Sequence, residues 1–407
     1  MIKQEWRVLY LILDGYPTFR PDVAALWGRY LPQEGVYSDL STIEVPKSDP
    51  APLWGGGKAM VYSRPANRIK EQLGSFFHDY RVLSQAPENT YDAIQVRDKS
   101  FVCIPAMWAA KRLGVPFFYW MSFPMAESLA MLAGRLNPWR EFPRWIFLWV
   151  RGHIGGALLR RYILPRCDHV FVQSDKMLSD LVALGLSPDN MTPVPMCIDP
   201  ERFKALPAGE KINIAPKTIG YLGECSRVRR IDFLFKALGH VRKKNPNVRL
   251  LIVGGATDDA DRQWLRDCME EEGVAEFVIM TGWLPSEEVL PHFAQVDLAL
   301  ALMAPDPLLD STTPTKLVEY LAMGLPVVAN DHPDQNLVLS ESGAGLTTPF
   351  DPIAYGDAIL TLLEDDQLRL DMAQKGRPYV FAKRSYPQMA SNLACVYKRL
   401  LSKRGRK

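Results

Sequence analysis

The residues best suited to chemistry in this 407-residue chain lie between positions 310 and 329. Small hydroxyl residues and Pro314 precede an amphipathic stretch there, which predicts that a helix begins near Thr315. The free backbone N–H groups at such a helix start can hold a diphosphate, and Lys316 adds a full positive charge. Glu319 follows on the same helix face, within reach of a ribose diol. Taken alone, the segment favours an ordinary capped helix, and a nucleotide diphosphate site is the alternative that its residue types allow.

The elements that must position these residues are predicted from short apolar runs, rich in Val, Ile and Tyr, that alternate with amphipathic stretches. This alternation is typical of strand–helix–strand units and parallel sheets. Two series of strands are predicted, at 8–13, 93–96, 116–120 and 169–173, and at 218–222, 249–253, 277–281, 298–301 and 326–329. The sequence therefore predicts an α/β fold with two Rossmann-like, doubly wound parallel-sheet domains. Ligands of such sheets bind at the carboxyl ends of the strands, so a central cleft between the domains is expected.

A proline-rich segment separates the two series of strands. Residues 191–216 contain five prolines and show little periodicity, so we expect the connection between the domains there. The predicted organisation is an N-terminal domain over 1–198, a linker over 199–216 and a C-terminal domain over 217–385. The final segment, 386–407, has apolar residues at helical spacing and is expected to form a helix that packs back on the N-terminal domain.

Composition and charge exclude several classes of protein. Hydrophobic residues make up 47% and charged residues 23% of the chain, which is typical of a globular protein rather than a disordered one. Lys and Arg total 48 against 46 Asp and Glu, so the net charge of +2 argues against a nucleic-acid partner. The six cysteines lie far apart, as core thiols in a reducing cytoplasm do. With no secretory signal and no apolar run of about 20 residues, we expect a cytoplasmic protein for which peripheral membrane contact stays open.

Neither a metal ion nor a bound cofactor is expected. His and Cys residues do not cluster, and no Asp-Xaa-Asp motif occurs where a nucleotide-bound metal would need it. Gly254 and Gly255 end a predicted strand, but the spaced glycines of a dinucleotide-binding turn are missing. The sequence therefore argues against a dinucleotide-dependent oxidoreductase.

The segment 310–329 resembles the signature of glycosyltransferase family 4, whose members are retaining enzymes of the GT-B fold. In that family a loop enters a helix with a nucleotide-ribose glutamate and then runs into a Gly-Xaa-Pro-Val-Val strand, which corresponds to residues 324–328 here. Three segments that precede this stretch also resemble the family and occur in the family's order. They are Gly220-Tyr-Leu-Gly223, Leu251-Ile-Val-Gly-Gly255 and Thr281-Gly-Trp-Leu-Pro285. The resemblance covers nearly the whole C-terminal half and is looser in the N-terminal half.

The resemblance implies metal-independent transfer of a hexose from a nucleotide diphosphate sugar to a saccharide acceptor, in particular a lipid-linked one, in the assembly of a cell-surface polysaccharide. It assigns acceptor binding to the N-terminal domain and nucleotide-sugar binding to the C-terminal domain. The donor would be held by Glu319, Thr313, Pro314, Thr315, Leu317, Gly15, Gly223 and Gly282. Two alternatives stay open: a nucleotide-sugar epimerase or phosphorylase of the same fold, and a non-catalytic subunit that binds a sugar nucleotide.

One departure from the family pattern concerns a pair of glutamates separated by seven residues. The second is Glu319, whereas the first, which contacts the donor sugar in relatives, falls here at Ser311. Asp310 is one residue away and is expected to substitute in part. This departure is one reason why a binding role without catalysis stays open.

A second departure concerns the basic pair of the phosphate loop. The first place of the pair is occupied by Glu224 and the second by Arg229, while Arg230 stands where relatives have a glycine. An acidic residue cannot neutralise a leaving diphosphate, so Arg229, Arg230 and Lys316 would have to carry that charge. For Arg230 a structural salt bridge is an equal alternative.

In the N-terminal domain, the resemblance implies that the loop 13–22 faces the diphosphate and the acceptor. The family's glycine pair is missing from this loop, and Asp22 has a helix N-cap as its competing role. The charged run 97–99 follows a predicted strand, where a solvated turn is the alternative, and Ser122 replaces a histidine found in many relatives. The predicted acceptor-binding residues are Arg20, Asp22, Arg97, Lys99 and Ser122.

The stretch 135–166 is unusual in composition. It holds seven arginines against one acid, Glu141, with tryptophans and aliphatic residues between them. Arginines beside indoles suit the headgroup region of an anionic membrane, so we expect contact with the inner membrane surface through Arg140, Arg144, Trp145 and Trp149. The alternative is a packed pair of helices with buried tryptophans.

Overall fold

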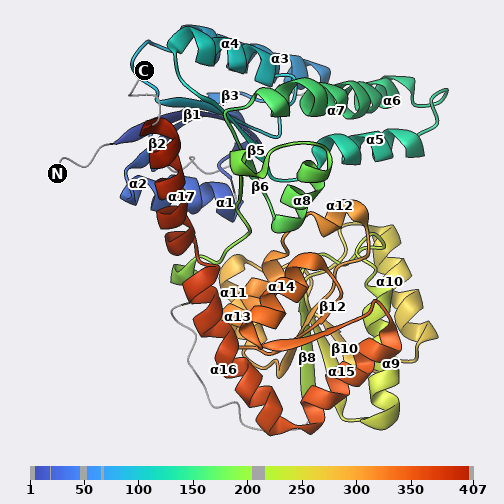
Figure 1. Cartoon of the computed structure of the whole chain (residues 1–407). Coiled ribbons are helices and arrows are strands. Elements are labelled where there is room, and N and C mark those ends of the chain that lie inside the picture. The colour runs from blue at the N-terminus through green and yellow to red at the C-terminus, as the bar shows by residue number, and fades with distance from the viewer. Residues whose placement is uncertain (1–4, 19, 46–52, 66–67, 204–215, 403–407) are drawn as a thin grey trace. The chain divides into compact units, whose positions relative to one another are not determined.

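The computed structural model describes residues 5–18, 20–45, 53–65, 68–203 and 216–402 (Figure 1). The chain divides into two compact units, of which unit 1 comprises Met1–Met196 with Tyr386–Lys407 and unit 2 comprises Cys197–Ser385. Each unit is built on a parallel sheet with helices on both faces. The described part of the chain contains no helix that is both long enough and apolar enough to cross a bilayer.

Unit 1 is built on a seven-stranded sheet of order β3-β2-β1-β4-β5-β6-β7. Its strands are β1 Trp6–Tyr16, β2 Val36–Glu44, β3 Ala59–Tyr62, β4 Ala93–Arg97, β5 Phe117–Met121, β6 His169–Val172 and β7 Met191–Pro193. Its helices are α1 Pro21–Ala24, α2 Leu31–Gln33, α3 Arg68–Gln85, α4 Cys103–Leu113, α5 Met125–Arg135, α6 Phe142–Trp149, α7 Gly155–Leu158, α8 Asp175–Ala183 and α17 Tyr386–Ser402. Short helical turns complete it: η1 Leu26–Tyr30, η2 Val150–Ile154, η3 Leu159–Ile163, η4 Leu164–Arg166 and η5 Pro188–Asn190.

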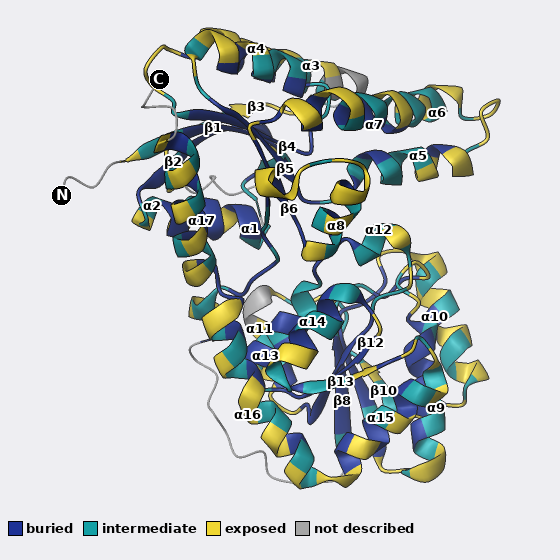
Figure 2. Ribbon diagram, in the orientation of Figure 1, coloured by how far each residue is buried: buried dark blue, intermediate teal, exposed yellow. Residues whose placement is uncertain are grey.

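Both faces of the unit 1 sheet are covered, and for this reason β4 and β5 are buried along their whole length (Figure 2). On one face, side chains of α3, α4, η3 and α8 pack on the sheet. On the other face α17 packs on η1, where the rings of Trp27 and Tyr397 lie 5.6 Å apart. The Tyr397 hydroxyl also donates a hydrogen bond to Gln95 of β4, which ties the last helix to the middle of the sheet.

Unit 2 has a six-stranded sheet of order β10-β9-β8-β11-β12-β13. Its strands are β8 Lys217–Leu222, β9 Val248–Val253, β10 Val278–Met280, β11 Leu298–Ala301, β12 Val327–Asn330 and β13 Gly345–Thr348. Its helices are α9 Asp232–Lys244, α10 Asp259–Glu271, α11 Ser286–Phe293, α12 Pro307–Asp310, α13 Thr315–Ala322, α14 Pro333–Ser342, α15 Pro352–Glu364 and α16 Asp366–Lys383, with the turns η6 Pro200–Phe203 and η7 Ala275–Phe277. Side chains of α9, α10 and α15 form a core on one sheet face, and those of α11, α13, α14 and α16 form a core on the other.

The strand order places a topological switch point in each sheet. In unit 1 the order reverses between β1 and β4, and in unit 2 it reverses between β8 and β11. Ligands of open α/β sheets bind outside the carboxyl ends of the strands at such points. The loops that follow β8 and β11 are the ones in which the sequence predicts the phosphate loop and the start of α13.

The predicted doubly wound fold is confirmed, but four strands were not predicted: β2, β3, β7 and β13. Strand β7 lies inside the segment 191–216 that was expected to be a connection, and the part of that segment from 204 to 215 lies outside the described residues. Strand β2 escaped notice because Ser38, Asp39, Ser41 and Thr42 give it a polar sequence, although all four are buried.

Candidate functional site

Strands β8 and β9 are each followed directly by a glycine that no other residue type could replace without strain. Gly223 has φ +133°, and a Cβ atom there would lie 2.6 Å from Cε and 2.7 Å from Nζ of Lys316. Gly254 has φ +137°, and a Cβ atom there would lie 2.1 Å from the carbonyl oxygen of Gly223. Close backbone approach of this kind is available only to glycine. The two loops therefore pack directly against each other and against the lysine side chain of α13.

Lys316 is a partly buried cation on the first turn of α13. Its Nζ donates a hydrogen bond to the Tyr221 hydroxyl at 2.6 Å and lies 4.3 Å from the centroid of that ring. Among the described residues, no carboxylate lies within ion-pair distance of Nζ. Burial, reinforced by the positive charge of Arg229, lowers the pKa of Lys316 to about 8. A cation held in this way has charge available for an anionic ligand.

Glu319 lies one turn further along α13, and its side chain is 19% exposed. Burial raises its pKa above the ordinary value, while the positive charges of Arg202 and Lys316 act in the opposite direction. Nη1 of Arg202, from η6, lies 3.5 Å from Oε1 of Glu319. Sequence reasoning missed Arg202, because the sequence separation of 117 positions between the two partners hides this pairing. The carboxylate and the lysine predicted to hold a nucleotide thus share one small region of unit 2.

Helix α13 is anchored to β8 by Tyr320. The Tyr320 hydroxyl accepts a hydrogen bond from the backbone N–H of Leu222 at 2.7 Å. Pro314 is the N-cap residue, and its side chain makes no capping hydrogen bond to the first turn. The N–H groups of this turn are therefore available to a ligand. Leu317 is fully buried in the core, so only its backbone could contact the predicted donor.

The loop before α13 positions Ser311 and Asp310 at the end of the short helix α12. Ser311 is buried at the C-cap, Asp310 is partly exposed in the helix, and Thr313 is buried just after it. The neighbouring Leu309 carbonyl oxygen lies 3.0 Å from Nε2 of His332, a buried histidine that sequence reasoning did not select. Asp310 is thus the acidic side chain that stands beside the position where relatives have a glutamate.

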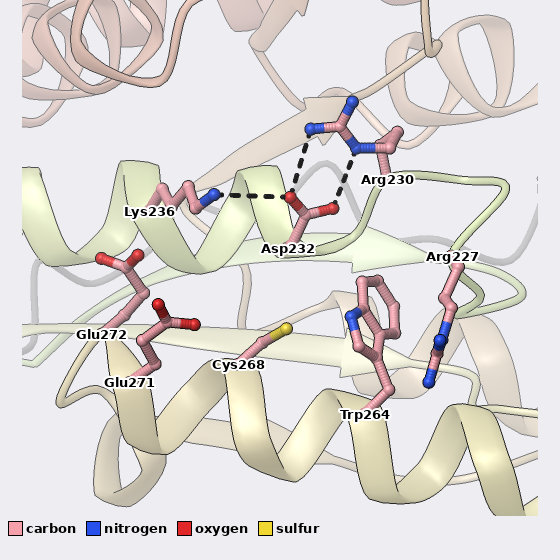
Figure 3. Close-up of a pocket in the computed structure, with 8 residues that line it drawn as sticks. All are labelled: Arg227, Arg230, Asp232, Lys236, Trp264, Cys268, Glu271 and Glu272. Atoms are coloured by element: carbon pink, nitrogen blue, oxygen red, sulfur yellow. Dashed lines mark hydrogen bonds and ion pairs between the residues drawn. The ribbon is translucent and has the colours of Figure 1, made fainter.

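Arg230 occupies a different place from Arg229. Its backbone is left-handed, with φ 55°, a conformation that glycine adopts without strain. Its guanidinium binds both oxygens of Asp232, at 3.1 and 3.3 Å (Figure 3). Both residues line a pocket of about 350 Å³ together with Arg227, Lys236, Trp264, Cys268, Glu271 and Glu272. The geometry favours the salt-bridge interpretation of Arg230, and its predicted role at a diphosphate stays untested.

In unit 1, a buried ion-pair network lies at the carboxyl ends of β1 and β4. The fully buried Arg97 contacts Asp22 at 2.6 Å (Nη2–Oδ2) and Asp14 at 3.2 Å (Nε–Oδ2). Arg20, which is 41% exposed, lies 3.2 Å from Asp22. Burial opposes ionisation of Asp22, but the charges of Arg97 and Arg20 prevail and lower its pKa to about 2. Arg20, not Asp22, is the N-cap residue of α1, so the competing N-cap role of Asp22 is wrong.

The charged run 97–99 at the end of β4 is buried. The alternative interpretation of this run as a solvated turn is therefore wrong. Asp98 is buried with φ 55°, and it accepts hydrogen bonds from the backbone and the hydroxyl of Ser122. Lys99 is buried as well, with Nζ 2.7 Å from Asp79. Because Arg97 and Lys99 are enclosed with carboxylate partners, Arg20 and Asp14 are the members of this region with side chains open to solvent. Gly15 lies inside β1 rather than in a loop.

The residues predicted for membrane contact lie in and before α6. Arg144 is exposed, whereas Trp145 and Trp149 are partly buried with their rings 6.1 Å apart. The described residues contain no group of His, Cys, Asp and Glu side chains suited to a metal ion.

Two family descriptions match the chain, one in each unit. "Glycosyl transferases group 1" matches residues 216–365, and "Glycosyl transferase 4-like domain" matches residues 22–197. Together they span most of the sequence, including the start of α13 and the Asp22–Arg97 pair of unit 1.

Curated relatives match over shorter stretches. A D-inositol 3-phosphate glycosyltransferase of Corynebacterium urealyticum is 27% identical over 194 residues, which are 46% of this chain and 44% of that protein. A GDP-mannose-dependent alpha-(1-6)-phosphatidylinositol monomannoside mannosyltransferase of Mycobacterium tuberculosis is 27% identical over 212 residues, which are 49% of this chain and 54% of that protein. The chain thus spans about half the length of the curated relatives it matches.

Solved structures show the same fold. Sucrose-phosphate synthase from Thermosynechococcus elongatus has a TM-score of 0.70 at 17% identity, covering 98% of this chain and 100% of that one. An Anabaena protein solved in complex with UDP has a TM-score of 0.67 at 16% identity, covering 97% of this chain and 100% of that one. These likenesses, the two family matches and the paired parallel sheets lead to one conclusion: the chain belongs to the group 1, family 4-like glycosyltransferases of GT-B fold.

Proposed function

We propose that the protein is a retaining hexosyltransferase that uses a nucleotide diphosphate sugar and a saccharide acceptor. The observation that carries this proposal is Lys316, a partly buried cation without a carboxylate partner among the described residues, beside Gly223 and one turn from Glu319. A lysine, an open helix start and a carboxylate in one region match the diphosphate and ribose of one nucleotide. The two curated relatives named above, a D-inositol 3-phosphate glycosyltransferase and a GDP-mannose-dependent mannosyltransferase, support the same class of donor.

In the proposed reaction, an acceptor hydroxyl forms a new bond to the anomeric carbon from the side on which the nucleotide leaves. The bond between that carbon and the diphosphate oxygen breaks, the diphosphate takes the electron pair, and the hydroxyl proton passes to the leaving oxygen. Lys316 and Arg229 stabilise the negative charge that grows on the diphosphate. Glu319 accepts hydrogen bonds from the ribose hydroxyls. Because side-chain cations neutralise the leaving group, this proposal requires no metal ion.

We further propose that the acceptor is lipid-linked, that it serves the assembly of a cell-surface polysaccharide, and that the protein works at the cytoplasmic face of the inner membrane. The support is the Mycobacterium tuberculosis relative, which is named for a phosphatidylinositol acceptor, and the arginine-rich segment of unit 1. Arg20 and Asp14, at the carboxyl edge of the unit 1 sheet, are proposed to contact acceptor hydroxyl or phosphate groups.

A second candidate is a sugar-nucleotide-binding subunit without catalysis. Ser311 and Glu224 favour it, because relatives carry a glutamate and a basic residue at those positions. Both candidate functions predict nucleotide binding, but only the transferase predicts turnover.

The test is a panel of nucleoside diphosphates and nucleotide sugars, first for binding by thermal shift and then for donor hydrolysis or transfer by the purified protein. A retaining transferase gives a product whose anomeric configuration, measured by NMR, equals that of the donor. Glu319→Ala should weaken nucleotide binding at least several-fold, whereas Glu364→Ala, on the exposed face of α15, should not. Binding without hydrolysis or transfer would select the non-catalytic candidate, and unchanged affinity in Glu319→Ala would refute the assignment of the ribose site.

A further inference from the structure

A helical hairpin in unit 1 carries an apolar surface that the described residues do not cover. We define the α5–α6 hairpin as residues 125–149, which comprise α5, the connecting segment and α6 (Figure 1). The two helices pack closely because Gly152, just after α6, lies against α5: a Cβ atom there would be 2.4 Å from the backbone N of Ala130. The hairpin is thus a built element of unit 1 rather than a loose loop.

The apolar residues of the hairpin are concentrated at its tip and along α6. Seven of the eight residues of α6 are apolar. None of the eight is buried by the described part of the chain (Figure 2). Trp139 in the connecting segment is 94% exposed, and Phe142, at the first turn of α6, is 56% exposed. Met131 and Leu132 of α5 and Phe147 of α6 are exposed as well. A helix with this composition is normally buried, so its exposure indicates an unfilled contact.

The charges around this surface are nearly all positive. Arg135, Arg140 and Arg144 are exposed, and the one acid between residues 135 and 166, Glu141, lies 3.3 Å from Arg144 and is partly neutralised by it. Arg161 and Arg166 continue the exposed positive charge beyond the hairpin. An apolar tip ringed by arginines would repel an identical positively charged surface and attract an anionic one.

We propose that the tip of the α5–α6 hairpin docks on an anionic lipid bilayer, with Trp139 and Phe142 in the headgroup–acyl boundary and Arg140 and Arg144 on lipid phosphates. Indole and phenyl rings favour that boundary, and each arginine near an anionic surface strengthens binding roughly fivefold. The structure moves the inserting residues from Trp145 and Trp149, which are partly buried, to the exposed pair at the tip. The choice of a membrane partner rests on the proposed function, in which the acceptor is lipid-linked.

The experiment is co-sedimentation of the full chain with vesicles of pure phosphatidylcholine and with vesicles that contain about one third phosphatidylglycerol, at low and high salt. We expect binding to the anionic vesicles only, and weaker binding at high salt. Trp139→Ser with Phe142→Ser should reduce the vesicle affinity at least tenfold, and Arg140→Gln with Arg144→Gln should reduce it roughly 25-fold. The matched control is Trp108→Ser on α4, a tryptophan that is 67% exposed on a different helix and should leave binding unchanged.

Each other outcome overturns the proposal. The first is that the protein does not bind anionic vesicles at low salt. The second is that it binds neutral vesicles as well as anionic ones. The third is that both double variants bind anionic vesicles as tightly as the wild type. Loss of a concentration-dependent dimer in Trp139→Ser, measured by light scattering without vesicles, would assign the surface to a second copy of the chain. The melting temperature measured without nucleotide reports folding of every variant. Glu319→Ala should bind vesicles normally, so failure of the nucleotide site and failure of membrane docking are separately visible.

Discussion

Binding of a nucleoside diphosphate should depend on pH through Lys316. Burial and the charge of Arg229 lower the pKa of this lysine to about 8, so in the free protein it loses its proton above that pH. A diphosphate favours the charged form and raises the pKa again. The dissociation constant should therefore be flat below pH 8 and should rise about tenfold per pH unit above it. The nearby Cys225 and Tyr221 have pKa values raised by burial, to about 12 for Cys225, so neither titrates between pH 7 and 10.

Raising the pH above 8 should weaken nucleotide binding through Lys316 but should increase the stability of the folded protein. Its pKa is 10.5 in the unfolded chain and about 8 in the folded protein, and at about 1.4 kcal/mol per pH unit the difference amounts to roughly 3 kcal/mol. Because the unfolded chain binds more protons between these values, stability rises with pH from 8 to 10.5 and is lowest below pH 8. Lys316→Met removes this cost and loses one hydrogen bond to Tyr221, worth about 1 kcal/mol, so the variant should be more stable at pH 7 by about 2 kcal/mol.

The assay is calorimetric titration with UDP, or with the nucleoside diphosphate that the panel selects, from pH 7 to 10. Titrations at pH 9 in buffers of different ionisation enthalpy should show uptake of nearly one proton per nucleotide bound. Lys316→Met should bind weakly at every pH and take up no proton, while Lys375→Met, an exposed lysine of α16, should behave as the wild type. An affinity that does not change between pH 7 and 10, or the same slope in Lys316→Met, would refute the reasoning.

Three other predictions follow from the described contacts. Arg230→Gly and Arg230→Ala both lose the Asp232 ion pair, but the left-handed backbone favours glycine, so urea unfolding should show the Gly variant more stable by about 1 kcal/mol; equal stability would contradict the strain. Asp22→Asn leaves the charge of buried Arg97 poorly compensated and should lower the free energy of unfolding by about 3 kcal/mol, with a visible fall in Tm; a change under 1 kcal/mol would contradict the buried network. Arg229→Gln should lower kcat more than it weakens donor binding, and an effect on KM alone would place the residue in ground-state binding.

The parts of the fold that were predictable are those in which local sequence decides the outcome. Strands β8, β9, β11 and β12 were placed to within a residue or two, because each is a mostly apolar run in a sheet covered on both faces. Strand β2 was not, because its buried polar residues are satisfied from far away in the chain. The Asp39 carboxylate, for example, accepts hydrogen bonds from Arg7 and Tyr91.

The candidate site was predictable where its residues are close in sequence, and its contacts between distant residues were not predictable. Lys316 and Glu319 share one helical turn, so their spacing alone brings them together. The partners Arg202 for Glu319 and Asp22 for Arg97 lie 117 and 75 residues away, and no local pattern announces such pairings. Burial is likewise a property of the folded chain, and for this reason the run 97–99 looked solvated in sequence and is enclosed in the structure.

The path of the chain also affects the order in which the protein can assemble on the ribosome. Unit 2 is one continuous segment, whereas unit 1 needs α17, which is synthesised after all of unit 2. Until then the aromatic face of β4, β5 and β6 lacks Tyr397, which stacks on Phe171 at 5.0 Å and bonds to Gln95. A nascent unit 1 therefore exposes these aromatic side chains until unit 2 has been synthesised. That takes the time needed to translate some two hundred residues at about 5–20 residues per second. A shortened gene that stops before α17 would make this transient state permanent, whereas a fragment of unit 2 alone would keep every strand of its sheet.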